Sequence, residues 1–154
     1  MFMAELGCFY GESTIEFARC VGFVYAIDPW SEDYADHPDL LMAGRDFHQS
    51  MAEVEAIFDD LAKDFPNIQK RKARHQDVAP MIEDGSLDVV YIDTEHSYVA
   101  TAEAIELWAT KVKIGGWVSG HDYADLFPGV KVAVDEACPS LLRTWGDGNW
   151  AWRV

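Results

Sequence analysis

Long apolar runs are missing from this sequence of 154 residues. No stretch approaches the about 20 consecutive apolar residues that a membrane-spanning helix needs. The N-terminus also lacks the basic-then-apolar pattern of a secretory signal segment. We therefore expect a cytoplasmic protein with no membrane partner.

Cysteine is scarce as well. The chain has three cysteines, Cys8, Cys20 and Cys138, and they form no C-x-x-C pair. An odd number without such spacing argues against a disulfide scaffold or a zinc site and favours reduced thiols. We expect Cys8 to be a small packed residue rather than a nucleophile.

Basic residues are few, with 12 Lys and Arg against 27 Asp and Glu and a net charge of -15. Because proteins bind nucleic-acid phosphates through Lys and Arg, we expect no nucleic-acid substrate. Hydrophobic residues, in contrast, make up 49% of the chain. This composition predicts a single folded domain with a sizeable core.

Apolar strand-like segments alternate with amphipathic helix-like segments along the chain. We expect strands at 3–6, 23–27, 68–74, 87–92 and 117–120, helices at 13–21, 47–61, 78–83, 99–112 and 130–137, and a closing hairpin of 141–145 and 150–154. This order predicts an α/β fold, a doubly wound, mostly parallel Rossmann-like sheet with a C-terminal antiparallel hairpin. The long connection at 29–45 is a candidate lid or substrate loop.

The most informative segment is the glycine turn after the first predicted strand. Gly7 and Gly11 can supply a tight turn and a close backbone approach to a ligand, and Ser13 lies near the start of the next helix. Asp28 ends the second predicted strand, where a carboxylate can accept hydrogen bonds from ribose hydroxyls. The pattern indicates a nucleoside-cofactor site, and its alternative is a plain tight turn.

A second group of polar residues follows the fourth and fifth predicted strands. Asp93, Glu95 and His96 come after the first of these strands, and His121 and Asp122 after the other. The carboxyl ends of neighbouring parallel strands meet at one edge of a sheet. Two carboxylates and an imidazole there can hold a divalent cation or serve as acid and base without metal. In the alternative interpretation, these side chains cap the following segments.

Together, the glycine turn and several downstream motifs resemble class I S-adenosylmethionine-dependent methyltransferases, in the group that includes macrocin-type O-methyltransferases. The downstream motifs are the run 87–93, His96-Ser97, Gly115-Gly116, His121-Asp122 and the segment 129–135, and the similarity covers nearly the whole chain. It implies that S-adenosylmethionine is the cofactor. The residues that it places beside this cofactor are Glu5, Gly7, Cys8, Phe9, Gly11, Ser13, Asp28, Gln76, Asp77 and Asp93.

The resemblance also implies a catalytic group. It places a cation, Mg²⁺ or another divalent ion, on Asp93, His121 and Asp122, and a general base at Glu95 or His96. The expected reaction is transfer of the methyl group to a hydroxyl oxygen of a small-molecule acceptor, with nitrogen or carbon as open alternatives. The bound cation would acidify that hydroxyl.

The first predicted strand begins almost at residue 1. We therefore expect a single domain, 1–154, that lacks the N-terminal helices usually covering the substrate in this family. Phe2, Phe9 and Tyr10 would then form an apolar surface near the cofactor, which predicts a homodimer. Two other functions are considered, a non-catalytic nucleoside-binding module and a Rossmann-like oxidoreductase or hydroxylase relative. A binding module would have no use for the polar group around Asp93.

Overall fold

A computed structural model describes residues 1–34, 49–138 and 142–154 of the chain. In these ranges seven strands form one sheet in the order β3-β2-β1-β4-β5-β7-β6. The strands are β1 (Phe2–Leu6), β2 (Phe23–Asp28), β3 (Ile68–Lys72), β4 (Leu87–Ile92), β5 (Val112–Gly120), β6 (Arg143–Thr144) and β7 (Trp150–Arg153). The helices are α1 (Glu12–Cys20), α3 (Met51–Ala62), α4 (His75–Val78), α5 (Tyr98–Ala109) and α6 (Pro128–Ala137), with 3₁₀ turns η1 (Glu32–Tyr34) and η2 (Ala79–Met81).

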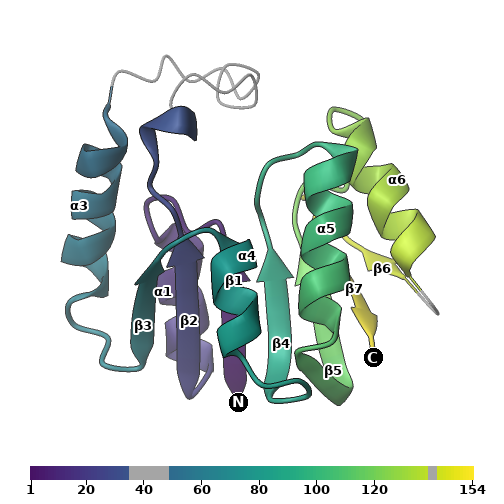
Figure 1. Cartoon of the computed structure of the whole chain (residues 1–154), viewed down its shortest axis with the longest axis horizontal. Coiled ribbons are helices and arrows are strands. Elements are labelled where there is room, and N and C mark those ends of the chain that lie inside the picture. The colour runs from purple at the N-terminus through teal and green to yellow at the C-terminus, as the bar shows by residue number, and fades with distance from the viewer. Residues whose placement is uncertain (35–48, 139–141) are drawn as a thin grey trace.

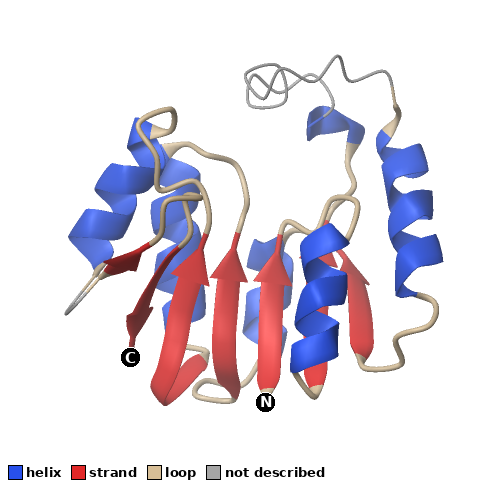
Figure 2. Ribbon diagram, turned by 180° about the vertical axis from the view of Figure 1, so that it is seen from behind, coloured by secondary structure: helices blue, strands red, loops and turns tan. Residues whose placement is uncertain are grey.

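The sheet is doubly wound, as predicted. Strands β1 to β5 run parallel, and β7 pairs antiparallel with both β5 and β6. Helices α4, α5 and α6 lie on one face of the sheet, and α1 and α3 on the other (Figures 1 and 2). The strand order reverses at β1, which lies between β2 and β4. In such sheets ligands bind at this reversal, beyond the carboxyl ends of the strands.

Two apolar layers hold the strands in place. On one face Trp108 of α5 and Trp150 of β7 are almost completely buried against the sheet. On the other face Val54 and Phe58 of α3 have no exposed surface. Burial of one such side chain contributes about 1.5–3 kcal/mol. These layers therefore fix the strand ends that carry the polar loops.

Helix α3 confirms the predicted amphipathic helix but starts later than expected. Ser50 is its N-cap, and Ser50 and Glu53 form a reciprocal capping box. A capping box defines a helix start because it satisfies two backbone donors that have no partner within the helix. Residues 47 and 48 of the predicted helix, and 35–45 of the predicted lid, lie outside the described residues.

Several predicted boundaries were wrong. Helix α5 ends at Ala109 and β5 begins at Val112, although the glycines at 115 and 116 had predicted a turn. Gly115 has a φ of 84°, and the pairing of β5 with β4 shifts register near Leu87. The strand therefore continues through the glycines as an irregular pairing. Helix α4 begins at His75, earlier than the predicted helix at 78–83.

Among the described residues, no helix is long and apolar enough to cross a membrane.

Candidate active site

Gly7 begins the turn after β1 and lies directly against the loop after β4. Its φ is 84°, and a Cβ added there would lie 1.8 Å from the carbonyl oxygen of Asp93. Only glycine fits this position, because both its conformation and its surroundings exclude a side chain. Gly11, with a φ of 89°, is the N-cap of α1, and a Cβ there would lie 2.7 Å from the Phe58 ring.

Asp28 organises the loops after β1 and β2. Its Oδ2 accepts hydrogen bonds of 3.0 Å from the backbone N–H groups of Cys8 and Phe9, and its Oδ1 accepts one of 2.7 Å from Trp30. Burial raises the pKa of Asp28, and these backbone hydrogen bonds oppose that rise. Oδ2 already accepts two of these bonds, whereas Oδ1 accepts one and keeps capacity for another, and the residue lines the main cavity.

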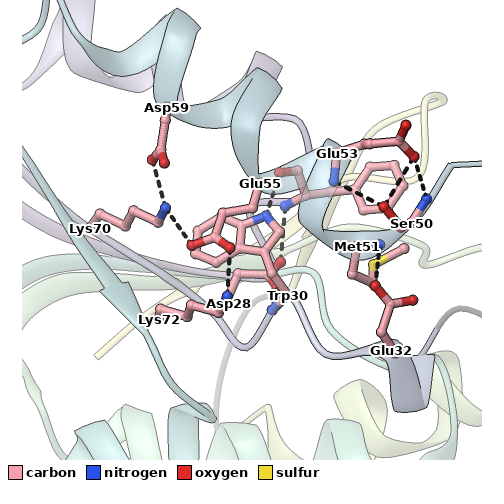
Figure 3. A network of polar contacts seen from close by, with 11 residues as sticks. Asp28, Trp30, Glu32, Ser50, Met51, Glu53, Glu55, Asp59, Lys70 and Lys72 are labelled. Atoms are coloured by element: carbon pink, nitrogen blue, oxygen red, sulfur yellow. Dashed lines mark hydrogen bonds and ion pairs between the residues drawn. The ribbon is translucent and has the colours of Figure 1, made fainter.

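Trp30 braces the same loop and had no sequence signal. Its indole N–H donates to the carbonyl of Phe9 at 2.9 Å, and its ring packs on Phe58 at 4.9 Å between centroids. The Lys70 ammonium lies 4.8 Å from the Trp30 ring centroid and forms ion pairs with Glu55 and Asp59 (Figure 3). These contacts hold the loops after β1 and β2 against α3 and β3.

Phe9 and Trp30 share an unusual backbone conformation, with φ values of 47° and 40°. Among the described residues other than glycine, Asp122 is the third with a positive φ, at 62°. Such residues cost about 1–3 kcal/mol each and cluster at functional sites. All three lie in loops that follow parallel strands, at the edge predicted to bind ligands.

Glu5 lies beneath the cofactor loop, fully buried in β1. Its two carboxylate oxygens accept hydrogen bonds from the hydroxyls of Ser13 and Thr14. Burial raises the pKa of Glu5 to about 7. The predicted helix residue Ser13 thus ties α1 to β1. Burial also raises the pKa of the Cys8 thiol well above its usual value, which agrees with a packed rather than a nucleophilic cysteine.

Asp93, His96 and Asp122 form a compact group where β4 and β5 end. Each offers one ligand atom, and these three atoms lie within 4.8 Å of one another. His96 Nε2 is 2.6 Å from Asp122 Oδ2 and 3.7 Å from Asp93 Oδ1. We call these three residues the catalytic cluster, after the role that is proposed for them below. Sequence reasoning named all three, but it did not find the pairing of His96 with Asp122, which joins the loops after two different strands.

His121 has a different surrounding. Its Nδ1 lies 3.2 Å from Asp122 Oδ1, and its Nε2 lies 2.9 Å from the carbonyl of Asp147. Both ring nitrogens therefore face oxygen acceptors, and only an imidazolium has a donor on each. The hydrogen bond to Asp122 raises the pKa of His121 to about 9. A protonated imidazole has no lone pair for a metal ion.

Asp122 is an acceptor for both imidazoles. Burial alone would raise the pKa of Asp122, but hydrogen bonds from His121 and His96 hold it well below its usual range. The carboxylate therefore stays ionised throughout the physiological range.

One cavity of about 690 Å³ joins the two groups of loops. Among the described residues, its lining includes seven of the predicted cofactor and catalytic positions, of which His96 is one, and both of the predicted metal ligands after β5. The others are Gly7, Phe9, Asp28, Gln76, Asp93 and Glu95, with His121 and Asp122 as the metal ligands. Of the other predicted positions, Glu5, Cys8, Gly11, Ser13 and Asp77 are not part of this lining.

His75 also lines the cavity and was not predicted. The buried Trp108 indole donates to His75 Nδ1 at 3.3 Å, and burial lowers the pKa of the imidazole. An indole N–H can only donate, so Nδ1 must be the unprotonated acceptor. His75 is thus a neutral ring whose Nε2 carries the proton. Its Trp partner is distant in sequence, so no local pattern could reveal the contact.

A family model described as a methyltransferase domain matches residues 4–123. No curated protein sequence matches the chain. Among solved structures, the O-methyltransferase NovP has a TM-score of 0.72 and 21% identity, covering 99% of this chain and 71% of that one. An O-methyltransferase from Bacillus cereus in complex with S-adenosylhomocysteine has a TM-score of 0.58 and 18% identity, covering 97% and 71%. The Methanococcus jannaschii fibrillarin, a pre-rRNA processing protein, has a TM-score of 0.61 and 16% identity, covering 97% and 64%.

Proposed function

The chain belongs to the methyltransferase-domain family and is a class I S-adenosylmethionine-dependent methyltransferase, and from this premise we propose that it methylates a hydroxyl oxygen of a small-molecule acceptor. The observation that carries the proposal is the single cavity that joins Asp28 to the catalytic cluster. A cofactor bound at Asp28 would have its reactive end beside Asp93. The acceptor would then enter between the cofactor and Asp122.

We assign the cofactor contacts as follows. Asp28 accepts hydrogen bonds from the ribose hydroxyls, and the backbone at Gly7 and Phe9 borders the cofactor closely. Gln76 lies on the adenine side, where its amide also donates to Glu103 at 2.8 Å. The buried or more distant positions Glu5, Cys8, Gly11, Ser13 and Asp77 support this site from beneath or beside it.

The catalytic cluster fits a divalent cation by its donor chemistry. Asp93 and Asp122 offer carboxylate oxygens, and His96 offers an imidazole nitrogen within the same small volume. Carboxylates suit Mg²⁺ and Mn²⁺, and an imidazole shifts the preference toward transition metals. Sequence reasoning gave the third position to His121. Because the ligand atoms of Asp93, His96 and Asp122 lie together, whereas His121 Nε2 faces the carbonyl of Asp147, we give that position to His96, with His121 orienting Asp122.

A cation held there would act as a Lewis acid on the acceptor hydroxyl. The protein's own groups do the rest. Glu95 lines the cavity two residues after Asp93 and can accept the hydroxyl proton. His96 is the other candidate base if it does not bind metal. Leu126 and Phe127 line the acceptor side and help to exclude water. Orientation of the nucleophile in line with the methyl carbon and sulfur supplies much of the rate.

The acceptor class follows from charge. Asp93, Glu95 and Asp122 line the acceptor end of the cavity, which disfavours phosphate-rich nucleic acid and favours a neutral hydroxylated molecule.

We also propose that the protein is a homodimer. Phe2 is 54% exposed, whereas Phe9 and Tyr10 pack partly against the cluster around Trp30. Light scattering with cofactor present would measure the mass.

The proposed function is tested by calorimetry followed by an acceptor screen. S-adenosylhomocysteine should bind in the presence or absence of Mn²⁺, and Mn²⁺ binding should require Asp93. Mass spectrometry should then detect S-adenosylmethionine-dependent methylation of a hydroxylated small molecule. Failure of the protein to bind S-adenosylhomocysteine would contradict the assignment of Asp28. Full turnover in the presence of chelator would show that the reaction needs no cation. His96 and Glu95 would then be the acid–base groups.

A further inference from the structure

We propose that the turn joining β6 to β7, residues 145–149, is a positioning element of the methyl-transfer site. Through its backbone carbonyls it holds the loop after β5 in the orientation that brings Asp122 to the catalytic cluster. The inference rests on the proposed function of that cluster. The turn lies outside residues 4–123, the segment that the family model matches.

The turn bonds to the residues on both sides of Asp122. The carbonyl of Asp147 lies 2.9 Å from His121 Nε2 and accepts its hydrogen bond. The carbonyl of Gly148 accepts a 2.9 Å hydrogen bond from the backbone N–H of Tyr123. Both distances are typical of well-formed hydrogen bonds. Asp122 is therefore held between two residues that the same turn fixes.

Asp122 needs such support because of its backbone. Its φ of 62° lies in the left-handed region, which aspartate tolerates better than most residues but which still needs support from its surroundings. A third contact comes from β7, where the indole N–H of Trp150 donates to the carbonyl of His121 at 2.9 Å. Trp150 is 1% exposed, so this anchor is part of the core. The C-terminal hairpin thus imposes the conformation that the site requires.

The turn is itself tied to β4. The hydroxyl of Tyr91 donates to Asn149 Oδ1 at 2.7 Å, and Tyr91 lies two residues before Asp93. Within the turn, Trp145 N–H donates to the carbonyl of Asn149 at 3.0 Å, and Gly148 N–H donates to the carbonyl of Trp145 at 3.1 Å. The strand that carries one carboxylate of the cluster therefore anchors the element that positions the other.

Two substitutions loosen the turn without touching the cluster. Tyr91→Phe removes only the hydroxyl that anchors Asn149. Its matched control is Tyr98→Phe, which removes a hydroxyl with a bond of the same length, 2.7 Å, to the exposed Glu136. A structural loss common to any Tyr→Phe change would appear in both variants.

Gly148→Ala acts on the backbone. Gly148 has a φ of 89°, and a Cβ there would lie 3.6 Å from the amide nitrogen of Asp122. The strain of an alanine at this φ must be relieved by movement of the turn. Gly146→Ala is the matched control, because a Cβ at Gly146 meets nothing within 4 Å.

The first measurement needs no metal and no acceptor. ¹⁵N NMR of the imidazole nitrogens reports the hydrogen bond at His121 Nε2. We expect the His121 signals to shift in Tyr91→Phe and in Gly148→Ala and to stay unchanged in Tyr98→Phe and Gly146→Ala. Unchanged signals in the first pair, or equal shifts in the controls, would overturn the inference. Because Tyr91→Phe is nearly isosteric, it keeps the test valid if Gly148→Ala does not fold.

The second measurement compares two affinities in the same variants. Groups that orient metal ligands change affinity by about 10–100-fold when they are lost. Mn²⁺ affinity should fall by at least about tenfold in Tyr91→Phe and Gly148→Ala, whereas S-adenosylhomocysteine affinity should stay within about twofold. Normal Mn²⁺ affinity in both variants, with binding lost in Asp93→Asn, would refute the role of the turn. Undiminished Mn²⁺ binding in Asp93→Asn would instead refute the proposed cation site, and the His121 signals would still decide the role of the turn.

Discussion

At the carboxyl ends of β1 and β2, the carboxylates of Glu5 and Asp28 accept hydrogen bonds from neutral groups, whereas in the loop after β5 Asp122 lies between two imidazoles. Glu5 is held by hydroxyls and Asp28 by backbone N–H groups, and burial raises the pKa of both. For Asp122, hydrogen bonds from His121 and His96 overcome burial and keep the pKa low.

The difference separates two tasks at one sheet edge. Neutral donors make a rigid cradle, which suits a cofactor that must be bound in one orientation. Charged partners keep a carboxylate ionised, which suits a group that binds a cation or takes part in proton transfer. Asp28 and Asp122 line the same cavity, so a carboxylate bonded to neutral donors and a carboxylate bonded to imidazoles both face it.

The largest effect on the comparison should come from neutralising the carboxylates of the catalytic cluster. Asp93→Asn and Asp122→Asn should each abolish methyl transfer, because each removes one of the two carboxylates of the cluster. S-adenosylhomocysteine affinity should remain nearly intact in calorimetry. Asp125→Asn, at an exposed acid three residues further on, is the control. Residual turnover close to wild type would contradict the assignment.

The environment of Glu5, at the carboxyl end of β1, can be tested through the pH dependence of the free energy of unfolding. The folded-state pKa of Glu5 is about 7, above the ordinary 4.5, so the folded protein holds this proton more tightly. Its contribution to the free energy of unfolding is fully present below pH 4.5 and is lost as pH rises to about 7. Wild type should lose on the order of 3 kcal/mol more than Glu5→Gln across this window. Denaturant unfolding at several pH values measures it.

Glu12→Gln, at an exposed acid in the first turn of α1, should show the same pH dependence as wild type. Parallel curves for wild type and Glu5→Gln would show that Glu5 does not couple folding to pH.

Removal of the proposed base should affect the chemical step and not binding. Glu95→Gln should slow single-turnover methyl transfer by about a hundredfold or more, as expected for a lost general base. His96→Ala should have a similar effect, accompanied by weaker Mn²⁺ binding if His96 is a ligand. Comparison of the two variants by rate and by metal affinity separates the roles. Glu83→Gln, at an exposed acid shortly before β4 begins, is the control. Normal rates for both site variants would show that neither is the base.

The smallest expected effect concerns the cofactor cradle. Asp28→Asn should weaken S-adenosylhomocysteine binding by about 1.5–3 kcal/mol, the range for hydrogen bonds to a charged group. Thermal unfolding should be recorded in parallel, because Asp28 also accepts three backbone hydrogen bonds. An unchanged affinity in a folded variant would place the ribose elsewhere.

Much of the fold could be predicted because its signals are local. Apolar runs gave the parallel strands, and the positions of Gly7, Asp28 and Asp93 at their ends followed from the strand pattern. The start of β5 was missed because Gly115 was interpreted as a turn, whereas the pairing with β4 accommodates it.

The site was harder to predict because its decisive contacts are long-range. Sequence reasoning named His96, His121 and Asp122 but could not tell which imidazole nitrogen faces which oxygen. The contact of His121 with Asp147 and the support of the cofactor loop by Trp30 join segments that no local pattern relates. Only the folded sheet brings these groups together.

The contact between Gly7 and Asp93 has a thermodynamic consequence. Because no side chain separates the two loops, a displacement of the loop after β1 must displace the loop after β4. Ligands that bind on either side of this contact are then energetically linked, and linkage is reciprocal. Whatever factor the cofactor adds to cation affinity, the cation must add to cofactor affinity. If a cation binds at the proposed site, the close contact at Gly7 would therefore make its binding and that of the cofactor cooperative.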